Sequence, residues 1–380
     1  MQHAVGPATL GLTALIIVAS ACFLRSASAG HGRDSIADSH SIPPDTVERW
    51  AAPYRTWHYY PRLVLTAELE GELGFRMVDG PNVFRHNGQW QMFYFGFDGT
   101  GYQACRAVSD DLLHWEGRGL VMSYGKAGAF DYGGVAFTGP LYDSIDVRRP
   151  PQLAQWNGRY WLLYGCYPEQ GGYELGSGGQ GLAWSQDGLQ WHRASRTTPV
   201  LSIDGASAWE ARVIYSPCVL RHEGMFWNFY NARGLTNREQ IGLARSADLK
   251  TWQRFEGNPL LGNTPGGYDE LLAADPEIYR DGDHWVMIYF GASRNSPDST
   301  LHAHTLIAFS RDLLHWTPHP EPILRAGGHP TGLDSTHAHN VSLVYNPDNH
   351  TRYMFYCAVG AQGRGIALVT NRPLPGTEAE

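Results

Sequence analysis

One short motif recurs along the chain with a fixed internal spacing, and it decides the fold. Residues 109–115 read Ser-Asp-Asp-Leu-Leu-His-Trp, and residues 310–316 read Ser-Arg-Asp-Leu-Leu-His-Trp. A serine followed six positions later by a tryptophan returns in two more pairs, Ser185/Trp191 and Ser246/Trp252. Repetition of this kind indicates an architecture in which each copy is one supersecondary unit.

A second motif precedes each copy of the first one. A proline is followed by apolar residues, a turn and, nine positions after the proline, an aromatic residue that opens an alternating strand pattern. The four pairs are Pro81/Trp90, Pro151/Tyr160, Pro217/Phe226 and Pro276/Trp285. A fifth, degenerate copy begins at His339-Asn340-Val341 and has its second strand at Tyr353-Met354-Phe355-Tyr356. Each copy therefore supplies several antiparallel strands.

The composition agrees with an all-β protein. The chain has 380 residues, of which 43% are hydrophobic and 17% charged, and this balance excludes a disordered chain and a multi-span membrane protein. The 44 glycines, 13 tryptophans and 20 tyrosines favour many short strands joined by tight turns. A net charge of −8 without any run of basic residues argues against a nucleic-acid partner.

Five such copies predict a five-bladed β-propeller. Antiparallel sheets of this size cannot bury both faces alone, and radial packing of equal sheets solves the problem. The last copy ends before its fourth strand, whereas Pro61-Arg62-Leu63-Val64-Leu65 precedes the first copy. We expect this N-terminal strand to complete blade five and close the ring, because closure removes two free sheet edges. The propeller domain then spans residues 61–380, after a loop-like lead-in at 30–60.

The first residues have the features of a targeting segment. An apolar run from Leu10 to Leu24 precedes the small-residue cleavage pattern Ala27-Ser28-Ala29, which predicts a signal peptide at 1–29. The protein is therefore expected to be exported, as a periplasmic, secreted or outer-surface protein. Two alternatives would attach it to a membrane, namely lipid modification at Cys22 and an uncleaved N-terminal anchor.

The four remaining cysteines do not form a recognisable framework. Their spacing resembles neither a disulfide scaffold nor a zinc site, and their neighbours are typical of strands. We expect buried thiols on separate strands at Cys105, Cys166, Cys218 and Cys357.

The residues before each proline are the positions at which the repeat diverges. The innermost strand of each propeller blade lines the central channel, and the proline strand is the natural innermost strand. The divergent positions are Asp79-Gly80, Arg148-Arg149-Pro150, Tyr215-Ser216, Ala274-Asp275, and His337 with His339-Asn340. A structural repeat does not need such different polar groups to converge at one place, so the divergence predicts a functional site.

With these residues, the sequence resembles the five-bladed propeller glycosidases. This group holds the family 43 arabinanases and β-xylosidases, the invertases and levansucrases, and the family 117 neoagarobiose hydrolases. Ala274-Asp275-Pro276-Glu277 resembles their Asp-Pro strand opening, and Asp79-Gly80-Pro81-Asn82 resembles the invertase Asn-Asp-Pro-Asn motif with an inserted glycine. The carboxylates of the second and third blades are replaced by Arg149-Pro150 and Tyr215-Ser216, while histidines in blade five make the site closest to the family 117 type.

The resemblance implies a glycoside hydrolase with acid/base chemistry at one mouth of the channel. Asp79 is expected to be the base or nucleophile, and Asp275 to orient the substrate or tune its neighbours. His339 is the expected proton donor, with His337 as its alternative. The side chains expected to bind substrate are Arg148, Arg149, Glu277, Tyr215, Asn340 and Glu210. Glycine-rich loops at 123–147, 168–181 and 262–273 favour a walled pocket and thus exo action.

Glu210 has two interpretations. It could be a catalytic acid, but an aromatic or apolar residue followed by an acid also recurs before the other blades. The recurring pairs are Phe130-Asp131, Tyr268-Asp269 and Leu333-Asp334. A recurring feature usually serves the scaffold, so the structural interpretation is favoured.

Two other functions remain open at this point. Arg148 and Arg149 could hold phosphate in a glycoside phosphorylase. The two missing carboxylates would also suit a non-catalytic glycan-binding propeller. No cofactor is expected to be required, although a calcium ion in the channel is compatible with the resemblance. The expected partner is a carbohydrate, and nothing in the sequence indicates an oligomeric state.

Overall fold

The computed structural model describes residues 41–295 and 299–374. The expected signal peptide at 1–29, Cys22 and residues 30–40 of the lead-in lie outside these residues. Within the described part, no helix is both long enough and apolar enough to cross a membrane.

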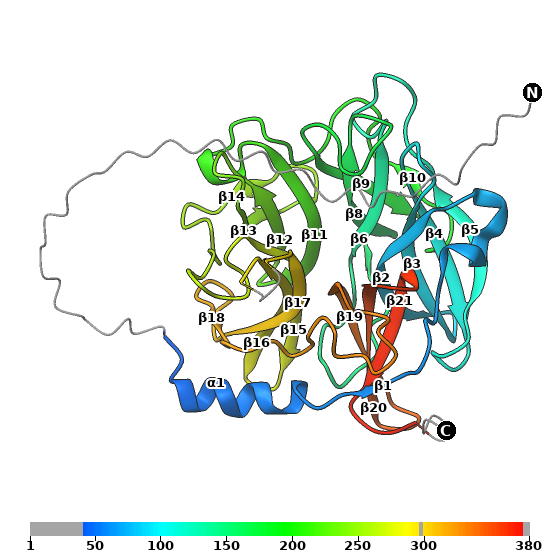
Figure 1. Cartoon of the computed structure of the whole chain (residues 1–380). Coiled ribbons are helices and arrows are strands. Elements are labelled where there is room, and N and C mark those ends of the chain that lie inside the picture. Colours follow the sequence, from blue (N-terminus) through cyan, green and yellow to red (C-terminus); the bar gives the residue numbers. More distant parts are fainter. Residues whose placement is uncertain (1–40, 296–298, 375–380) are drawn as a thin grey trace, which may run out of the picture. The chain divides into compact units, whose positions relative to one another are not determined.

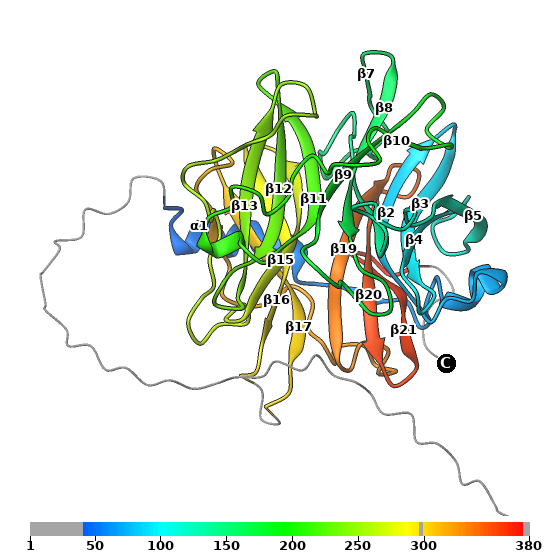
Figure 2. The same cartoon turned by 90° about the horizontal axis from the view of Figure 1, so that it is seen from above.

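Antiparallel pairing divides the described strands into groups that follow one another along the chain (Figures 1 and 2). The first group is β2 (Met77–His86), β3 (Gln89–Phe97), β4 (Tyr102–Ser109) and β5 (Glu116–Met122). The second is β6 (Gly134–Pro140), β7 (Gln155–Trp156), β8 (Arg159–Tyr167), β9 (Gly179–Ser185) and β10 (His192–Arg193). The third is β11 (Val213–His222), β12 (Met225–Arg233), β13 (Glu239–Ser246) and β14 (Gln253–Arg254).

The last two groups complete the described fold. The fourth is β15 (Leu272–Asp281), β16 (His284–Ser293), β17 (His302–Ser310) and β18 (Thr317–Pro318). The fifth is β19 (His337–Asn346), β20 (Thr351–Gly360), β21 (Gly363–Thr370) and β1 (His58–Tyr59). Parallel pairs β4–β6, β13–β15 and β17–β19 join these groups into one 9-stranded and one 12-stranded sheet. The helices are α1 (Pro44–Ala51) and the short 3-10 helices Ala52–Tyr54, Ala67–Leu73 and Ala208–Glu210.

The N-terminal segment pairs with the outer strand of the fifth group. β1 is antiparallel to β21, with His58 opposite Thr370. Further along, the amide of Val64 donates to the carbonyl of Ile366 at 2.8 Å, and Leu65 forms a bridge to the same residue. The strand expected at 61–65 therefore lies beside the fifth group, but the regular pairing begins earlier, at His58.

The recurring Ser-to-Trp motif is a turn that satisfies its own polar groups. The Ser109 hydroxyl accepts from the amide of Leu112 at 2.9 Å, and the Asp111 carboxylate accepts from two further amides. The Trp115 indole donates to the carbonyl of Leu112 at 3.2 Å. The other three copies make the same indole bond, from Trp191, Trp252 and Trp316. This hydrogen-bond pattern explains why serine, aspartate and tryptophan recur together.

The second group departs from the expected alignment. Its innermost strand is β6, in which Gly139 lies opposite Leu163, and not a strand opening at Pro151. Residues 141–154 form an insertion between β6 and β8. The spacing from Pro151 to Tyr160 thus matched the other copies without marking an inner strand. Thr138 occupies the position at the strand irregularity that we had given to Arg149.

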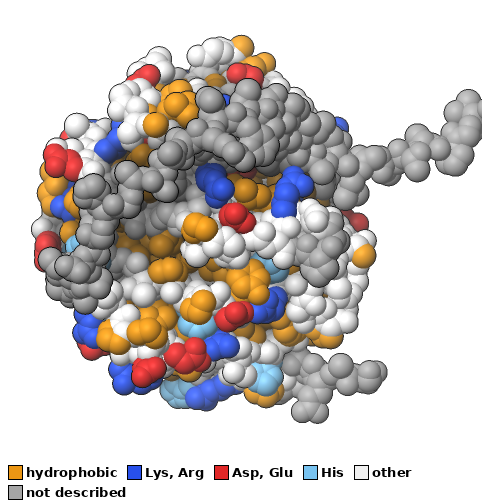
Figure 3. Space-filling model, turned by 60° about the vertical axis from the view of Figure 1, so that its left-hand side comes forward, with side chains coloured by type: hydrophobic (Ala, Val, Ile, Leu, Met, Phe, Trp, Pro, Cys, Tyr) orange, Lys and Arg blue, Asp and Glu red, His pale blue; other side chains and the backbone are white. Residues whose placement is uncertain are grey.

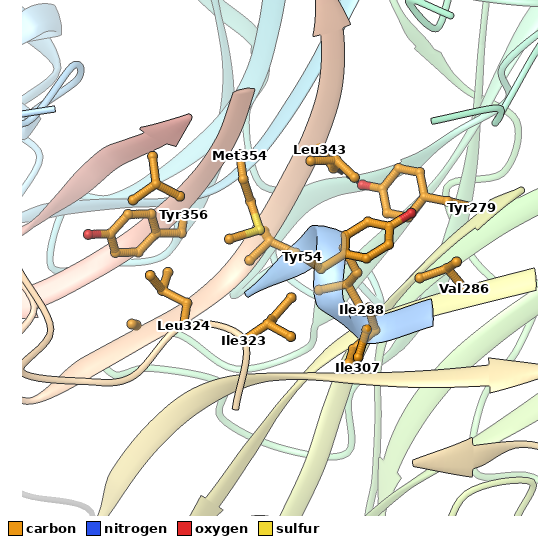
Figure 4. Close-up of a cluster of buried hydrophobic side chains, with 14 of the residues drawn as sticks. Tyr54, Tyr279, Val286, Ile288, Ile307, Ile323, Leu324, Leu343, Met354 and Tyr356 are labelled. Carbon is orange, nitrogen blue, oxygen red and sulfur yellow. Dashed lines mark hydrogen bonds between the residues drawn. The ribbon is translucent and has the colours of Figure 1, made fainter. Parts of the chain in front are cut away.

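The lead-in is a helix and a buried anchor, where we had expected a loop. After α1, the Tyr54 side chain is fully buried, and its hydroxyl donates to Asp281 at 2.9 Å. Figure 4 shows Tyr54 among side chains from the fourth and fifth groups, close to Tyr279 and Met354. The Trp50 ring stacks on His284 at 3.9 Å. The segment therefore holds two neighbouring groups together.

The four cysteines within the described residues are buried, as predicted. They lie on four different strands, namely Cys105 on β4, Cys166 on β8, Cys218 on β11 and Cys357 on β20.

The turn tryptophans are expected to act through stability. Trp115 is 8% exposed, and replacing it by alanine leaves a cavity, so Trp115→Ala should lower the free energy of unfolding by about 3–5 kcal/mol. Chemical denaturation of this variant beside Tyr173→Ala, whose side chain is half exposed, provides the measurement and its control. Unchanged stability of Trp115→Ala would contradict a structural role.

Candidate active site

Three inner strands open with the same backbone irregularity. Each has a break in register near its start, and the residue at the break has a left-handed backbone with a φ of 60° at Gly80, 48° at Asp275 and 49° at Asn340. Non-glycine residues seldom adopt this conformation, and it persists where the surroundings impose it. Such bulges redirect side chains. Here they surround a hollow lined by all five groups, including Gly80, Asn82, Thr138, Ser216, Asp275 and Asn340.

Asp79 is buried and held on both carboxylate oxygens. One oxygen accepts from the amide of Gly80 at 2.7 Å and from the side-chain amide of Asn340 at 3.0 Å. The other forms an ion pair with Arg364 on β21. The Arg364 guanidinium also contacts the Cys357 sulfur at 3.3 Å, and burial lowers its pKa to about 10. Asp79 therefore links the openings of the first and fifth groups.

Asp275 lies in a different electrostatic environment. Its side chain is partly exposed to the hollow, and a hydrogen bond from Ser216 reaches it. Burial raises its pKa to about 7, helped by the negative charges of Glu174 and Glu239. Near neutral pH a large fraction of this carboxyl carries a proton, whereas an ordinary aspartate is ionised.

Glu174 and Glu239 are the residues that the sequence analysis missed. Glu174 lies in the loop between β8 and β9, where desolvation and the charge of Glu239 raise its pKa to about 7. Glu239, the first residue of β13, is 5% exposed and pairs with Arg233, whose Nη2 lies 2.5 Å from its Oε1. Asn231 donates to its other oxygen at 3.1 Å. The carboxyls of Glu174, Glu239 and Asp275 interact electrostatically with one another.

A signal for Glu239 was present in the sequence. The residues at the opening of the first strand differ between copies, and those at the opening of the third strand differ as well. The residues that take the place of Glu239 at the start of the third strand are uncharged or weakly basic, namely Tyr102, Gly179, His302 and Gly363. The same comparison applied to the third strands would have singled out this carboxylate. Glu174 lies in a loop outside the repeat, and no spacing points to it.

The two histidines are neutral near pH 7. The His337 Nδ1 accepts from the amide of Ala303 at 3.1 Å, and burial, with neighbouring histidines, lowers the His337 pKa to about 3. His339 is 7% exposed, and burial lowers its pKa to about 4. A neutral imidazole is a poor proton donor. This environment suits a hydrogen-bonding role better than the donor role expected from the sequence.

One trio of side chains has the types that bind metals. Donor atoms of Asp79, His339 and Cys357 lie within 4.8 Å of one another, the one such group in residues 41–295 and 299–374. The Arg364 cation already contacts two of the three. Calcium prefers six or more oxygen ligands, and this set offers a single carboxylate. The trio therefore fits neither calcium nor a further cation beside Arg364.

Arg148 lies far from the hollow. It is exposed, bonds to Asp146 in the insertion and lies 3.9 Å from Asp281. Asp281 is six residues beyond Asp275 on β15, which corresponds to about 20 Å along a strand. Arg149 lines a second cavity, which shares Asn82, Thr138 and Glu277 with the hollow. Arg148 and Asp275 are therefore not brought together.

Glu277 is half-buried and lines the hollow, and Tyr215 is buried next to Ser216 of its lining. Burial and Asp275 raise the pKa of Glu277, which the Cys218 thiol contacts at 3.9 Å. Tyr215 is 4% exposed, and its ring lies 5.5 Å from the Arg233 guanidinium. Tyr215 thus flanks the arginine that holds Glu239.

Glu210 is part of a pattern shared by four groups. It is 1% exposed, accepts from the Tyr230 hydroxyl at 2.7 Å and pairs with Arg254 at 2.8 Å. A tyrosine of the second strand donates to an acid in the same way in three other groups, namely Tyr164 to Asp131, Tyr289 to Asp269 and Tyr356 to Asp334. The arrangement agrees with the structural interpretation of Glu210.

Comparison with known proteins points to one group of enzymes. Residues 147–332 match the "Glycosyl hydrolases family 32 N-terminal domain". A solved structure described as "Glycoside hydrolase" is 26% identical with a TM-score of 0.75, over 89% of this chain and 100% of that one. The resemblance to the broad group of glycoside hydrolases that includes the invertases is thereby confirmed. The family 117 pattern of the site stays a prediction.

Two further likenesses are more distant. The raffinose invertase of Escherichia coli is 24% identical over 220 residues, which are 56% of this chain and 40% of the enzyme. The chain spans less than half the length of the curated relatives that it matches. A structure from the GH130 family of mannoside phosphorylases and glycoside hydrolases is 15% identical with a TM-score of 0.57, over 78% of this chain and 85% of that one, and shows the fold alone.

The raised pKa of Asp275 predicts a pH-dependent stability. Because the folded pKa of about 7 exceeds the ordinary value of 3.8, the folded state binds more protons than the unfolded state between these pH values. The free energy of unfolding should therefore fall as pH rises from about 4 to about 7, and Asp275 contributes at most one bound proton to this pH dependence. Asp275→Asn should lose that part of the slope. Denaturation curves across this pH range measure it, and an identical slope in wild type and variant would contradict the assignment.

Proposed function

We propose that the protein is an exo-acting glycoside hydrolase whose active site is the hollow at the bulged strand openings. The likeness to family 32 and to the solved glycoside hydrolase supports the reaction class. The observation that carries the site is the coupling of Asp275, Glu174 and Glu239 in one place. A hydrolase of glycosides needs one carboxyl that carries a proton and one that is ionised.

The residues of this site lie together at one channel mouth if the five strand groups are blades of one closed ring. The pairing of β1 with β21 and the hydrogen bond from the Val83 amide to the Ser342 hydroxyl at 3.0 Å, which joins the fifth group to the first, support this arrangement. In such a ring the openings of β2, β15 and β19 meet at one channel mouth. The openings of β6 and β11 face them from the other side.

We assign Glu239 and Glu174 the two carboxyl roles that the reaction requires. The Arg233 guanidinium and the Asn231 amide fix the position of the Glu239 carboxyl, which suits a base or nucleophile. Glu174 keeps a proton near neutral pH, which suits a general acid. Glu174 is on the solvent side, where the leaving part of the substrate would lie in an exo enzyme.

Asp275 and Asp79 then have supporting roles. Asp275 and Asn340 line the hollow and are placed to bind hydroxyl groups of a terminal sugar. Asp79 accepts from the Asn340 side chain at 3.0 Å, so we assign it the positioning of Asn340. His337 and His339, both neutral, are assigned hydrogen bonding to the substrate.

The two alternatives lose part of their support. A phosphorylase would need the arginine pair beside the carboxylates, and Arg148 lies about 20 Å along the strand from Asp275. A purely glycan-binding protein was favoured by missing carboxylates, but Glu174 and Glu239 supply two. Release of free sugar in phosphate-free buffer, compared with sugar phosphate in phosphate buffer, separates the reactions.

Loss of the general acid should depend on the leaving group. A general acid contributes about 10²- to 10⁴-fold, so Glu174→Gln should lose that factor in kcat/KM on oligosaccharides. It should lose much less on 4-nitrophenyl glycosides, whose leaving group needs no proton. Kinetics on a panel of both substrate types provide the measurement.

Two matched variants make the outcome specific. Glu169→Gln changes a glutamate of the same loop for which no coupling to the site exists, and it should keep full activity on both substrate types. His339→Ala should lose activity equally on both. A leaving-group-dependent loss in His339→Ala, with none in Glu174→Gln, would return the acid role to the histidine.

A further inference from the structure

A second hollow gathers cationic side chains at the opposite end of the inner strands. Its lining includes Arg148, Asp281, His350, Arg352, Asn371 and Arg372. Three arginines and one histidine thus surround a single carboxylate, in a chain whose net charge is −8. On the face drawn in Figure 3, by contrast, basic and acidic side chains are interspersed.

This hollow is separate from the candidate active site. It lies at the ends of β15, β19 and β21, whereas Asp275 and Glu239 lie near the beginnings of β15 and β13, and Glu174 lies in the loop before β9. Asp281 and Asp275 share β15 and are about 20 Å apart along it. A ligand in one hollow therefore does not occupy the other.

Two of the arginines are held in place by neighbouring residues. The Arg352 guanidinium donates to the carbonyl of Pro53 at 2.9 Å and lies over the Tyr54 ring at 4.8 Å, which fixes its orientation. The Arg148 guanidinium pairs with Asp146 at 3.4 Å and lies 3.9 Å from Asp281, which also accepts from the Tyr54 hydroxyl. Within the described residues, the Arg372 guanidinium forms no hydrogen bond.

His350 and Asn371 add further hydrogen-bond donors. The Nδ1 atom of His350 bonds to the Tyr345 hydroxyl at 2.8 Å, which leaves Nε2 for a ligand. The Asn371 side-chain oxygen accepts from the amide of Arg352 at 2.8 Å, so its NH₂ group is available. The lining therefore offers several donors and one acceptor, which is the balance that an oxyanion requires.

We propose that this hollow binds the oxyanion groups of an acidic glycan, a uronate carboxylate or a sulfate ester. Guanidinium groups match both oxyanions through paired N–H donors. Pro53 and Val147 give the hollow an apolar border against which a sugar ring can pack. The inference does not rest on the proposed hydrolase activity, because binding at this hollow can be measured without turnover.

Calorimetric titration of the whole protein tests the proposal. The probes are glucuronate, glucose 6-sulfate, inorganic sulfate and neutral glucose. We expect the two acidic sugars to bind, more weakly as salt is added, and glucose not to bind. The double variant Arg148→Gln/Arg372→Gln should weaken binding at least about tenfold, since each removes charge-assisted hydrogen bonds. Arg118→Gln, on β5 of the first group, removes the same charge elsewhere and should leave binding unchanged.

Each opposing result overturns the proposal. Equal affinity of the wild type and the double variant, or no binding of either acidic sugar, would show that the hollow is not an oxyanion site. Inorganic sulfate binding as tightly as both sugars would show a free-anion site and exclude the glycan. The two replaced side chains are exposed, so the melting temperature of the double variant should match that of Arg118→Gln and exclude misfolding as the cause.

Discussion

A left-handed backbone residue at the start of an inner strand is the constraint on which the candidate site depends. Gly80, Asp275 and Asn340 adopt it on three strands, and in each case the register breaks at that residue. In a regular strand, successive side chains point alternately to the two sheet faces. The bulges turn the side chains of Asp275 and Asn340 toward the hollow. Asp79 contacts both Asn340 and Arg364 and so links the first group to the fifth. The sheets stabilise the fold, and the bulges place the side chains of the candidate site.

The repeat made the fold predictable, because its residues encode local hydrogen bonds. The Ser-to-Trp turn and the second strands were found at the expected places. The inner strand of the second group was predicted to open at Pro151, because the spacing from Pro151 to the next strand matches the other copies. Pro151 lies in an insertion, however, and the inner strand is β6. Proline spacing does not distinguish an inner strand from an inserted loop.

The candidate site was only partly predictable. Asp79 contacts Asn340, and Asp275 and Asn340 line the same hollow; these residues could be selected because they interrupt the repeat. Glu174 belongs to a loop that the repeat does not constrain. The protonation states could not be predicted from the sequence, because they depend on burial and on charges brought together from distant segments. Burial lowers the pKa of His339 to about 4 and raises that of Asp275 to about 7, so near pH 7 the histidine is neutral and a large fraction of the carboxyl carries a proton.

The pairing of β1 with β21 has a consequence for biogenesis. His58 lies opposite Thr370, so the last strand of the fold binds a segment made near the beginning. Contacts between such distant parts of a chain form slowly, because a long loop must close before they contribute. The early segment, including the side chain of Tyr54, cannot form these contacts until β21 has been synthesised. During that interval its binding surface on the fourth and fifth groups does not exist, and the nascent chain depends on protection from aggregation.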